Sequence, residues 1–472
     1  MKKNISKFLR DTDSHKFSKS SLAKLPITLT LLFLTLTSQY VFSQTIVKSN
    51  DGELKITGYI RSGFAKDKEG NTQVSLQMPD APSKFSLGNQ PDTYGELEFR
   101  YKHFLNDEKD KSIEVRWMTS YYESFNDESS SNLNEWEKLN IRFHNLLNRN
   151  EIIWIGKRFY DRHTLYMIDR HWLNQGQTGI GFGMEQLLSG SEKGGQDIKW
   201  GVWRLERDDV KSFKNEKEDE LINYLADIRW VKIPIAQNYF VNFALNYSVR
   251  TENEDLGYDT KHGYGAISWL DYTKNNISHT TALLYKKGAN IFKDHATGES
   301  IIENPNNDKI VIYDLDDAYT LELNHSFLYD DKENFAFNAT LVAIHKDFGT
   351  APKVYNQQLQ NFQKTDAGHT MDWIGIGARP MVYINKYFRL TGELSYEYIN
   401  NKSAGVQGNM TKLAFTPEFS LKKGFYSMPV VRPYIAYAHW SNELKGSIAS
   451  SSEYLASRTS GLMFGLQFEL WW

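Results

Sequence analysis

The feature that most constrains this chain is an alternation of apolar and charged residues with a period of two. Between Phe388 and Tyr398, apolar or aromatic side chains alternate with charged or hydroxylated ones. The same alternation recurs in residues 97–101, 113–118, 138–144 and 462–472. Because successive side chains of a strand point to opposite faces, each segment predicts a β-strand with one apolar and one charged face. The chain is therefore predicted to be all-β.

Two all-β folds give such strands. A soluble sandwich turns its apolar faces inward, whereas a transmembrane antiparallel β-barrel turns them toward lipid and its charges toward a water-filled lumen. Residues 462–472 end the sequence on a strand with a terminal aromatic, as a barrel that closes with its last strand would. We therefore predict the barrel. It requires Phe99, Ile141 and Phe468 to point away from the axis.

Composition narrows the class of protein. The 472 residues include 27 Tyr, 27 Phe and 12 Trp, too many aromatics for a disordered chain. A mean hydropathy of −0.55 is too polar for a bundle of membrane helices. Cysteine is absent, which excludes disulfides, zinc-thiolate sites and cysteine nucleophiles. The formal net charge of −3 gives no reason to expect a nucleic-acid partner.

The N-terminal region has the pattern of a secretory signal. Residues 25–37 are largely apolar, but the run is too short to span a bilayer, and the small residue Ser43 follows at a suitable distance. Seven cationic residues precede it: Lys2, Lys3, Lys7, Arg10, Lys16, Lys19 and Lys24. We predict a signal peptide at 1–43 and a single β-barrel domain at 44–472. A buried helix or a membrane anchor is the alternative for this segment.

Several motifs, in order, resemble the maltoporin family of carbohydrate-selective porins. The longest, at 154–169, reads WIGKRFYDRHTLYMID, and the chain ends in FGLQFELWW at 464–472. Shorter matches lie at 58–63 (GYIRSG), 84–97 (KFSLGNQPDTYGEL), 373–380 (WIGIGARP) and 432–440 (RPYIAYAHW). The resemblance implies a homotrimer of barrels of about 18 strands in the outer membrane of a Gram-negative-type bacterium. It also implies a constriction loop folded into the lumen, which Lys157 to Glu185 resembles; the glycine-rich run 176–183 would let that loop fold back.

By the same resemblance, sugars move along an aromatic track flanked by ionisable residues. A pyranose offers an apolar face to aromatic rings and hydroxyls to charged groups. The track positions match Tyr59, Tyr94, Trp373 and Trp471, and the polar positions match Arg61, Glu96, Arg162 and Asp169. Strand parity independently places all four aromatics on the polar face. The alternatives are that the rings only fill the lumen, and that the charges only brace the loop.

The sequence also departs from the family pattern. Ser86 and Glu137 stand where the family has arginines, and Thr164 replaces an aspartate. A tyrosine near the loop's end is matched only by His171 or Trp172. Phe125 is a poor match for the aromatic that a neighbouring subunit contributes, and Pro91 stands at one position of a cysteine pair. Because two lost arginines change the local field, ion selectivity and sugar preference stay open.

No catalytic motif is present: the chain lacks G-x-S-x-G, H-E-x-x-H and a P-loop. Glu96 and Glu98 resemble a glycosidase pair, but charges at i and i+2 more simply mark a water-facing side. We predict a channel for facilitated diffusion of maltose- or maltodextrin-type oligosaccharides, with no enzyme activity, cofactor or metal. The runner-up is a general diffusion porin, and a third reading is a secreted β-sandwich that binds or cleaves polysaccharide.

Overall fold

The computed structural model describes residues 44–472 except 126, 177–178, 189, 212–217, 256, 291–300, 305–308, 357–358, 360 and 449–451. The predicted signal peptide lies outside the described residues, so the boundary after Ser43 stays a prediction. In the described part of the chain, no helix is both long and apolar enough to cross a membrane.

Eighteen antiparallel strands form a closed barrel. They are β2 (Gly52–Asp67), β3 (Asp92–Phe104), β4 (Ser112–Ser124), β5 (Asp127–His144), β6 (Ile152–Lys157), β9 (Ile180–Glu185), β10 (Asp197–Lys211), β11 (Glu218–Ala236), β12 (Tyr239–Arg250), β13 (Lys261–Lys274), β14 (Ile277–Gly288), β17 (Tyr319–Asp330), β18 (Phe335–Asp347), β21 (Thr370–Tyr383), β22 (Phe388–Asn401), β23 (Val406–Ser420), β24 (Val430–Trp440) and β25 (Ser460–Trp471). The predicted fold class is confirmed.

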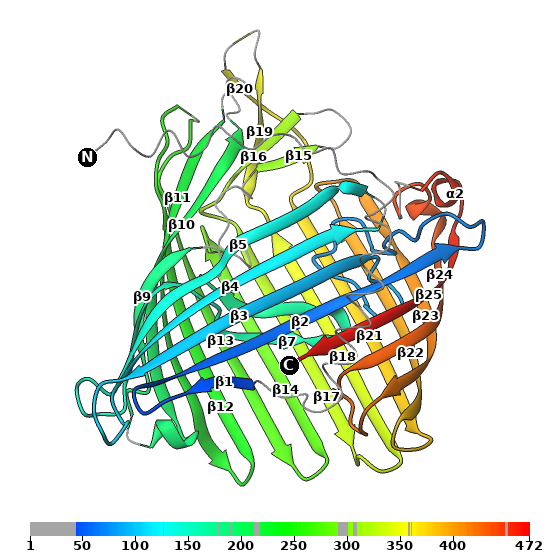
Figure 1. The fold of residues 1–472 in the computed structure, drawn as a ribbon. Coiled ribbons are helices and arrows are strands. Elements are labelled where there is room, and N and C mark those ends of the chain that lie inside the picture. Colours follow the sequence, from blue (N-terminus) through cyan, green and yellow to red (C-terminus); the bar gives the residue numbers. More distant parts are fainter. Residues whose placement is uncertain are drawn as a thin grey trace, which may run out of the picture. The chain divides into compact units, whose positions relative to one another are not determined.

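The barrel closes between its first and last strands. β2 pairs with β25 from Tyr59↔Trp471 to Asp67↔Met463, and Figure 1 shows the two strands side by side in blue and red. The short strand β1 (Gln44–Lys48) pairs with the start of β2 on the edge that β25 leaves free. Closure leaves no long unpaired edge on these strands, as a lipid environment requires.

Exposure along the wall is inverted relative to a soluble protein. On β12, Phe243, Leu245 and Tyr247 are 45–60% exposed, whereas Asn246 and Ser248 between and beside them are buried. Ile141 is likewise 38% exposed, and its neighbour Asn140 is buried. Glu98 is buried next to Phe99, and Gln467 is buried next to Phe468. The apolar residues therefore face outward, as the barrel prediction required and a sandwich would not allow.

Aromatic side chains ring the outside of the wall near both ends. At one end Tyr264, Tyr285, Tyr319 and His345 form a row with centroid separations of 6.2, 6.5 and 5.5 Å. At the other end Tyr239 and Tyr272 lie 4.5 Å apart. Eight residues of an inclined strand separate Tyr264 from Tyr272, which corresponds to roughly 20 Å of height. This matches the apolar band of a bilayer.

Two connections at the same end of the barrel send side chains inward. Residues 68–91, between β2 and β3, bury Leu76, Met78 and Phe85 in one apolar cluster with wall residues such as Val342 and Trp373. Residues 158–179 contain β7 (Tyr160–Leu165), the 3-10 turn η2 (Tyr166–Ile168) and β8 (Arg170–Gln175), a two-stranded hairpin. The sequence predicted an inward segment only for the second connection.

The predicted loop limits and the role of its glycines need correction. Ile180–Glu185 is strand β9, which pairs with β6 and β10 and belongs to the wall. A Cβ at Gly181 would overlap the Trp203 indole, and one at Gly183 would lie 2.8 Å from Trp154. These two glycines leave room for buried indoles; Gly176, with a φ of 67°, lies in the turn that leaves the hairpin.

The remaining elements lie in connections. β15 (Ile301–Asn304), β16 (Lys309–Asp314), β19 (Thr350–Asn356) and β20 (Asn361–Lys364) form a separate small sheet. The 3-10 turns η3 (Ser191–Lys193) and η4 (Asn442–Leu444) and the one-turn helix α2 (Glu453–Ala456) complete the described structure.

We predict that Leu245→Arg destabilises the barrel by about 2–4 kcal/mol, because it sets a charge against lipid near mid-strand. Unfolding by urea in lipid vesicles measures the change. The control, Leu147→Arg, replaces a leucine that is similarly exposed, at 54%, but lies in the β5–β6 connection. Equal effects of the two substitutions would contradict a lipid-facing Leu245.

Candidate functional site

A cavity of about 450 Å³ lies on the inner side of the barrel wall. β2, β3, β21, β23, β24 and β25 line it, together with residues 86–90, the hairpin and the β23–β24 turn. Seven of the eight predicted site residues take part: Tyr59, Arg61, Tyr94, Glu96, Arg162, Asp169 and Trp471. The eighth, Trp373, does not line the cavity.

Three aromatic rings follow one another across the seam. Tyr59 lies between the other two, with ring centroids 6.0 Å from Tyr94 and 6.5 Å from Trp471. The register explains this placement, since Tyr59 is the direct partner of Trp471 on β25 and Tyr94 lies opposite Arg61 on β3. Barrel closure thus assembles a row of rings from three strands.

Each tyrosine of this row is fixed by a carboxylate. The Tyr59 hydroxyl donates to Glu469 Oε1 at 2.9 Å, and the Tyr94 hydroxyl donates to Glu96 Oε1 at 2.7 Å. Since each phenol donates its only proton to the wall, its oxygen still has acceptor capacity for a ligand hydroxyl.

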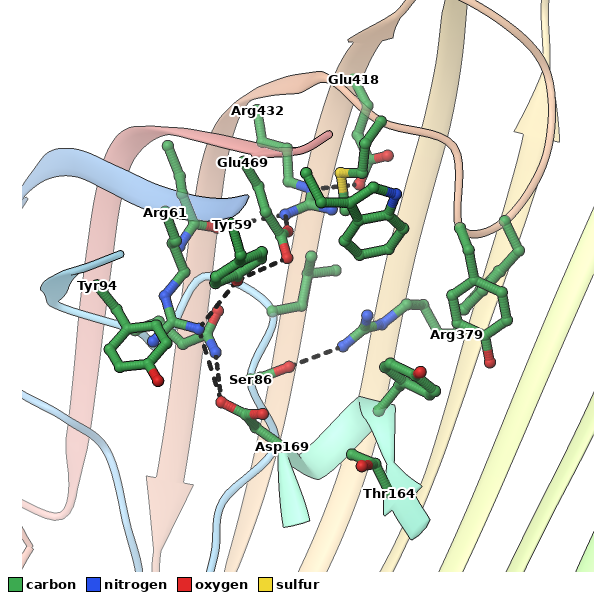
Figure 2. A pocket seen from close by; sticks show the side chains of 18 of the residues that line it. Tyr59, Arg61, Ser86, Tyr94, Thr164, Asp169, Arg379, Glu418, Arg432 and Glu469 are labelled. Atoms are coloured by element: carbon green, nitrogen blue, oxygen red, sulfur yellow. Dashed lines mark hydrogen bonds and ion pairs between the residues drawn. The ribbon is translucent and has the colours of Figure 1, made fainter. Parts of the chain in front are cut away.

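Arg61 connects the wall to the hairpin. Its Nη2 and Nε lie 2.7 and 3.0 Å from Asp92 Oδ1, and its Nη1 lies 3.6 Å from Asp169 Oδ2 (Figure 2). Asp169 follows η2 with a φ of 49°, a left-handed conformation that turns the chain back toward the wall. Its carboxylate remains half exposed to the cavity.

Other arginines of the cavity are also paired. Arg432 pairs with two glutamates: Glu418, at 3.0 Å from its Nε, and Glu469. Arg379 Nε donates to Glu393 at 2.9 Å. The charged lining consists of Arg61, Arg162, Arg379 and Arg432 against Glu96, Asp169, Glu418 and Glu469. With His171 neutral, the lining carries no net charge.

The departures from the family pattern can now be placed. Arg379 Nη2 donates to Ser86 Oγ at 3.2 Å, so a guanidinium lies beside this position although the expected arginine is missing (Figure 2). Glu137 does not line the cavity; Ser120 and Asn134 hydrogen-bond to it on the wall. Thr164 and His171 both line the cavity and hydrogen-bond to each other at 2.8 Å.

The hairpin is held by inward-facing residues of several strands. Arg229 of β11 donates to the Asp161 carbonyl at 2.9 Å, and Arg170 pairs with Glu322 of β17. The ring centroid of Trp172 lies 5.8 Å from that of Trp269 on β13. Together with the Asp169–Arg61 pair, these contacts span from β11 to β2. The hairpin thus contacts strands that lie far apart along the wall, and its role as a constriction loop stays a prediction.

The Asp161 carboxylate adds charge to this anchoring. Burial alone would raise its pKa, but the hydrogen bond with His163 and the cations Lys199 and Arg229 outweigh burial and hold the pKa well below its usual range. Asp161 is therefore ionised at neutral pH, and its carboxylate attracts Lys199, whose Nζ lies 3.0 Å away.

Trp373 lies where parity predicted, but it is covered. Its neighbours Ile374 and Ile376 are exposed on the outer face, so the indole does face inward. It is nevertheless fully buried in the apolar cluster beneath residues 68–91, where Phe85 packs against Gly377, four positions further along the strand. In this structure the indole is not accessible to a ligand, and the row has three rings instead of four.

The cavity also contains residues that the sequence did not single out. They are Tyr166 of the hairpin, Phe425 and Tyr426 of the β23–β24 turn, and the wall residues Arg379, Glu418, Arg432 and Glu469. The wall residues among them could have been found, because strand parity places them on the polar face and Arg432 begins the motif at 432–440. No strand pattern exists in a turn, so nothing pointed to Phe425 or Tyr426.

A closed antiparallel barrel with an apolar outer wall and a charged inner cavity defines an outer-membrane porin. The LamB porin family model matches residues 54–472, and the chain belongs to that family. The resemblance in the motifs is thus confirmed. The family supports the main function predicted from the sequence, a sugar-selective channel of the outer membrane, over the general diffusion porin.

Solved porin structures are similar to this chain at low identity. OmpF of Salmonella typhi in complex with daunomycin is 12% identical, with 90% of this chain and 99% of that chain covered and a TM-score of 0.45. OccD3 (OpdP) of Pseudomonas aeruginosa is 10% identical, with 93% of this chain and 96% of that chain covered and a TM-score of 0.44. OccAB4 of Acinetobacter baumannii is 9% identical, with 90% of this chain and 98% of that chain covered and a TM-score of 0.41.

We predict that Arg432→Met destabilises the protein by about 3–5 kcal/mol, because it leaves Glu418 and Glu469 buried without their shared cation. Denaturant unfolding in detergent measures the loss. In the control, Arg204→Met removes an outer-wall arginine that also pairs with glutamates but is 40% exposed, and it should cost at most about 1 kcal/mol. A small effect at Arg432 would show that the three-residue cluster adds little to stability.

Proposed function

We propose that this porin mediates passive uptake of neutral oligosaccharides, of the maltose and maltodextrin type, by stacking them on the row of rings formed by Tyr94, Tyr59 and Trp471. The observation that carries the proposal is this row of three rings on the inner wall, within one cavity and beside fixed charges. No energy source or cofactor is required, because sugar moves down its own gradient.

The two kinds of side chain suit the two surfaces of a pyranose. The rings offer flat apolar area to its C–H face. Arg61, Arg162, Glu96 and Asp169 are in position to exchange hydrogen bonds with its hydroxyl rim, and charged groups make the stronger bonds. Several weak contacts in series permit both entry and departure, which conduction needs.

The balanced lining fits an uncharged cargo. An anion or a cation entering the cavity meets four charges of each sign, so neither gains a net attraction. Ser86 and Glu137 remove two cations relative to the family pattern, but Glu137 lies outside the cavity and Arg379 lies beside Ser86. On this basis the channel has weak ion selectivity.

The hairpin would narrow the channel at this cavity. Arg162 and Asp169 project from it toward the wall residues that line the same space. Trp373 belongs to the sugar path only in a state in which residues 68–91 uncover it. We therefore do not count it among the residues that contact sugar.

We predict that Trp471→Ala weakens maltodextrin binding about five- to tenfold, because one stacking surface of roughly 1–1.4 kcal/mol is lost, while ion conductance persists. Current blockade in planar bilayers measures both. Trp136→Ala serves as the control, since this tryptophan is 54% exposed and does not line the cavity. Unchanged affinity would remove Trp471 from the track, and a wild-type channel without any blockade would indicate a general diffusion porin.

We predict that Arg162→Gln and Glu96→Gln shift ion selectivity in opposite directions, the first toward cations and the second toward anions. Each substitution unbalances a neutral lining by one charge. Reversal potentials in a salt gradient measure the shift, and the wild-type value should lie near zero. Strong wild-type selectivity would contradict the balanced lining.

We also propose export through a signal peptide at 1–43 and assembly into a homotrimer, both on the strength of the family resemblance. The assembled porin should migrate as a trimer in detergent before heating and as a monomer after it. N-terminal sequencing of the same material should begin at Gln44. A monomer under mild extraction, or a retained N-terminus, would overturn the corresponding statement.

A further inference from the structure

A largely apolar groove of about 670 Å³ lies on the outer face of the barrel, across β12, β13, β14, β17, β18 and β21. Its outward side chains belong to two neighbouring rows of directly paired residues that run across these six strands. Ala266 lies between Leu245 and Tyr285 in one row, and Ser268 lies in the other. The groove thus follows from side-chain size, because small residues of β13 lie between larger ones on both neighbouring strands.

This part of the wall faces lipid. Leu245 and Leu283, which line the groove, are 60% and 59% exposed. The rows of tyrosines near both ends of the wall, described above, lie on the same strands, and such aromatic belts mark the two membrane interfaces. A groove between the belts is filled by hydrocarbon, since water is absent at that depth.

One end of the groove is polar. Asp372 and His345 line it, and His345 Nδ1 lies 2.7 Å from Asp372 Oδ1. The Tyr319 hydroxyl lies 3.1 Å from Nε2 of the same imidazole. With the Nδ1 proton donated to Asp372, Nε2 accepts the Tyr319 proton, so the phenol oxygen and the carboxylate keep acceptor capacity for a ligand. The Asp372 side chain is 40% exposed on the lipid face, where an ionisable residue is rare and indicates a site.

A cation lies beside these acceptors. In the next row, Lys287 is the direct partner of Tyr264 on one side and of Tyr319 on the other. It has no ion-pair partner among the described residues. Asp347, the next residue of that row, is already engaged, because it accepts from the Gly349 N–H at 2.9 Å and lies 2.9 Å from His369 Nδ1. Lys287 is therefore available to an anionic group.

The lengths of the connections show which side of the membrane this polar end faces. At this end, residues 289–318 join β14 to β17 and residues 348–369 join β18 to β21. At the other end, the turns 275–276 and 331–334 are short. Outer-membrane barrels have short periplasmic turns and long extracellular loops, so the polar end lies at the outer leaflet.

We propose that this groove binds a phosphorylated glycolipid of the outer leaflet, the lipid A part of lipopolysaccharide. One acyl chain lies along the groove, a phosphate pairs with Lys287, and sugar hydroxyl or amide N–H groups donate to Asp372 and Tyr319. Each surface of an acylated, phosphorylated amino sugar thus meets a matching group, and charge-assisted hydrogen bonds hold its head. The site lies outside the barrel, so it is independent of the proposed function.

The test measures lipid binding to the purified, delipidated porin by native mass spectrometry in detergent. Diphosphoryl hexa-acyl lipid A is the probe, and phosphatidylglycerol and phosphatidylethanolamine are the comparison lipids. We expect the wild type to bind lipid A more tightly than either phospholipid. Lys287→Gln and Asp372→Asn should each weaken lipid A binding about fivefold or more, because each loses a charged partner of the head group.

A further variant tests the groove itself. Ala343→Phe places a ring in the groove and should weaken lipid A binding to a similar extent. Its control is Ala339→Phe, on the same face of β18 but outside the groove. Lys274→Gln is the control for Lys287→Gln, because Lys274 is an exposed lysine on the outward face of β13 at the other end of the barrel. Both controls should bind lipid A as the wild type does.

Three outcomes would overturn the inference. Lipid A binding that is equal in all variants would show that the groove is not the site. Phospholipids that bind as tightly as lipid A, and respond to the same substitutions, would indicate a general lipid contact. Loss of the oligomer in Ala343→Phe, with lipid A binding unchanged in Lys287→Gln, would assign the groove to a contact between copies of this chain. Should Ala343→Phe fail to fold, Lys287→Gln and Asp372→Asn decide the question.

Discussion

Closure of the sheet is the constraint on which the rest of this structure depends. In hydrocarbon, an unpaired backbone amide costs several kcal/mol, so the first and last strands must pair. That pairing sets Tyr59 opposite Trp471, while β3, on the other edge of β2, sets Tyr94 opposite Arg61. The seam that completes the hydrogen bonding of the wall is therefore also the place where the aromatic row forms. A shift of one residue in its register would turn Trp471 and Glu469 toward lipid.

The charges inside the barrel follow from the same inversion. Most are not free in water; they are buried against one another, as Arg432 is between Glu418 and Glu469. A buried cation left alone is strongly unfavourable, so each arginine of the cavity wall requires a carboxylate neighbour. Pairing fixes the guanidinium donors in place before a ligand arrives, and it cancels the field that would attract ions. A lining built to be stable in this way is thereby suited to a polar but uncharged solute.

The sequence predicted what depends on strand periodicity and motif order. Parity alone identified the outward faces and placed Tyr59, Tyr94 and Trp471 inside, and the motifs identified the family. What it missed depends on connections, whose course has no period. Trp373 is on the correct face, yet residues 68–91 cover it. The glycines at 181 and 183 looked like turn residues because a sequence does not show the indoles that pack against them.

The wall and the connections contribute different parts of the cavity, and these parts differ in how freely they can change. The row of rings belongs to the wall, whose geometry is fixed by hydrogen bonds along every strand. Other parts of the cavity lining come from the hairpin and the β23–β24 turn, which are held by side-chain contacts such as that of Asp330 with the Phe425 amide. Substitutions in a connection leave the hydrogen-bonded ladder of the barrel intact, so the width of the passage is free to vary while the stacking row is retained. On the proposed function, a barrel of this kind changes the shape of its passage through its connections and keeps its stacking surface through its seam.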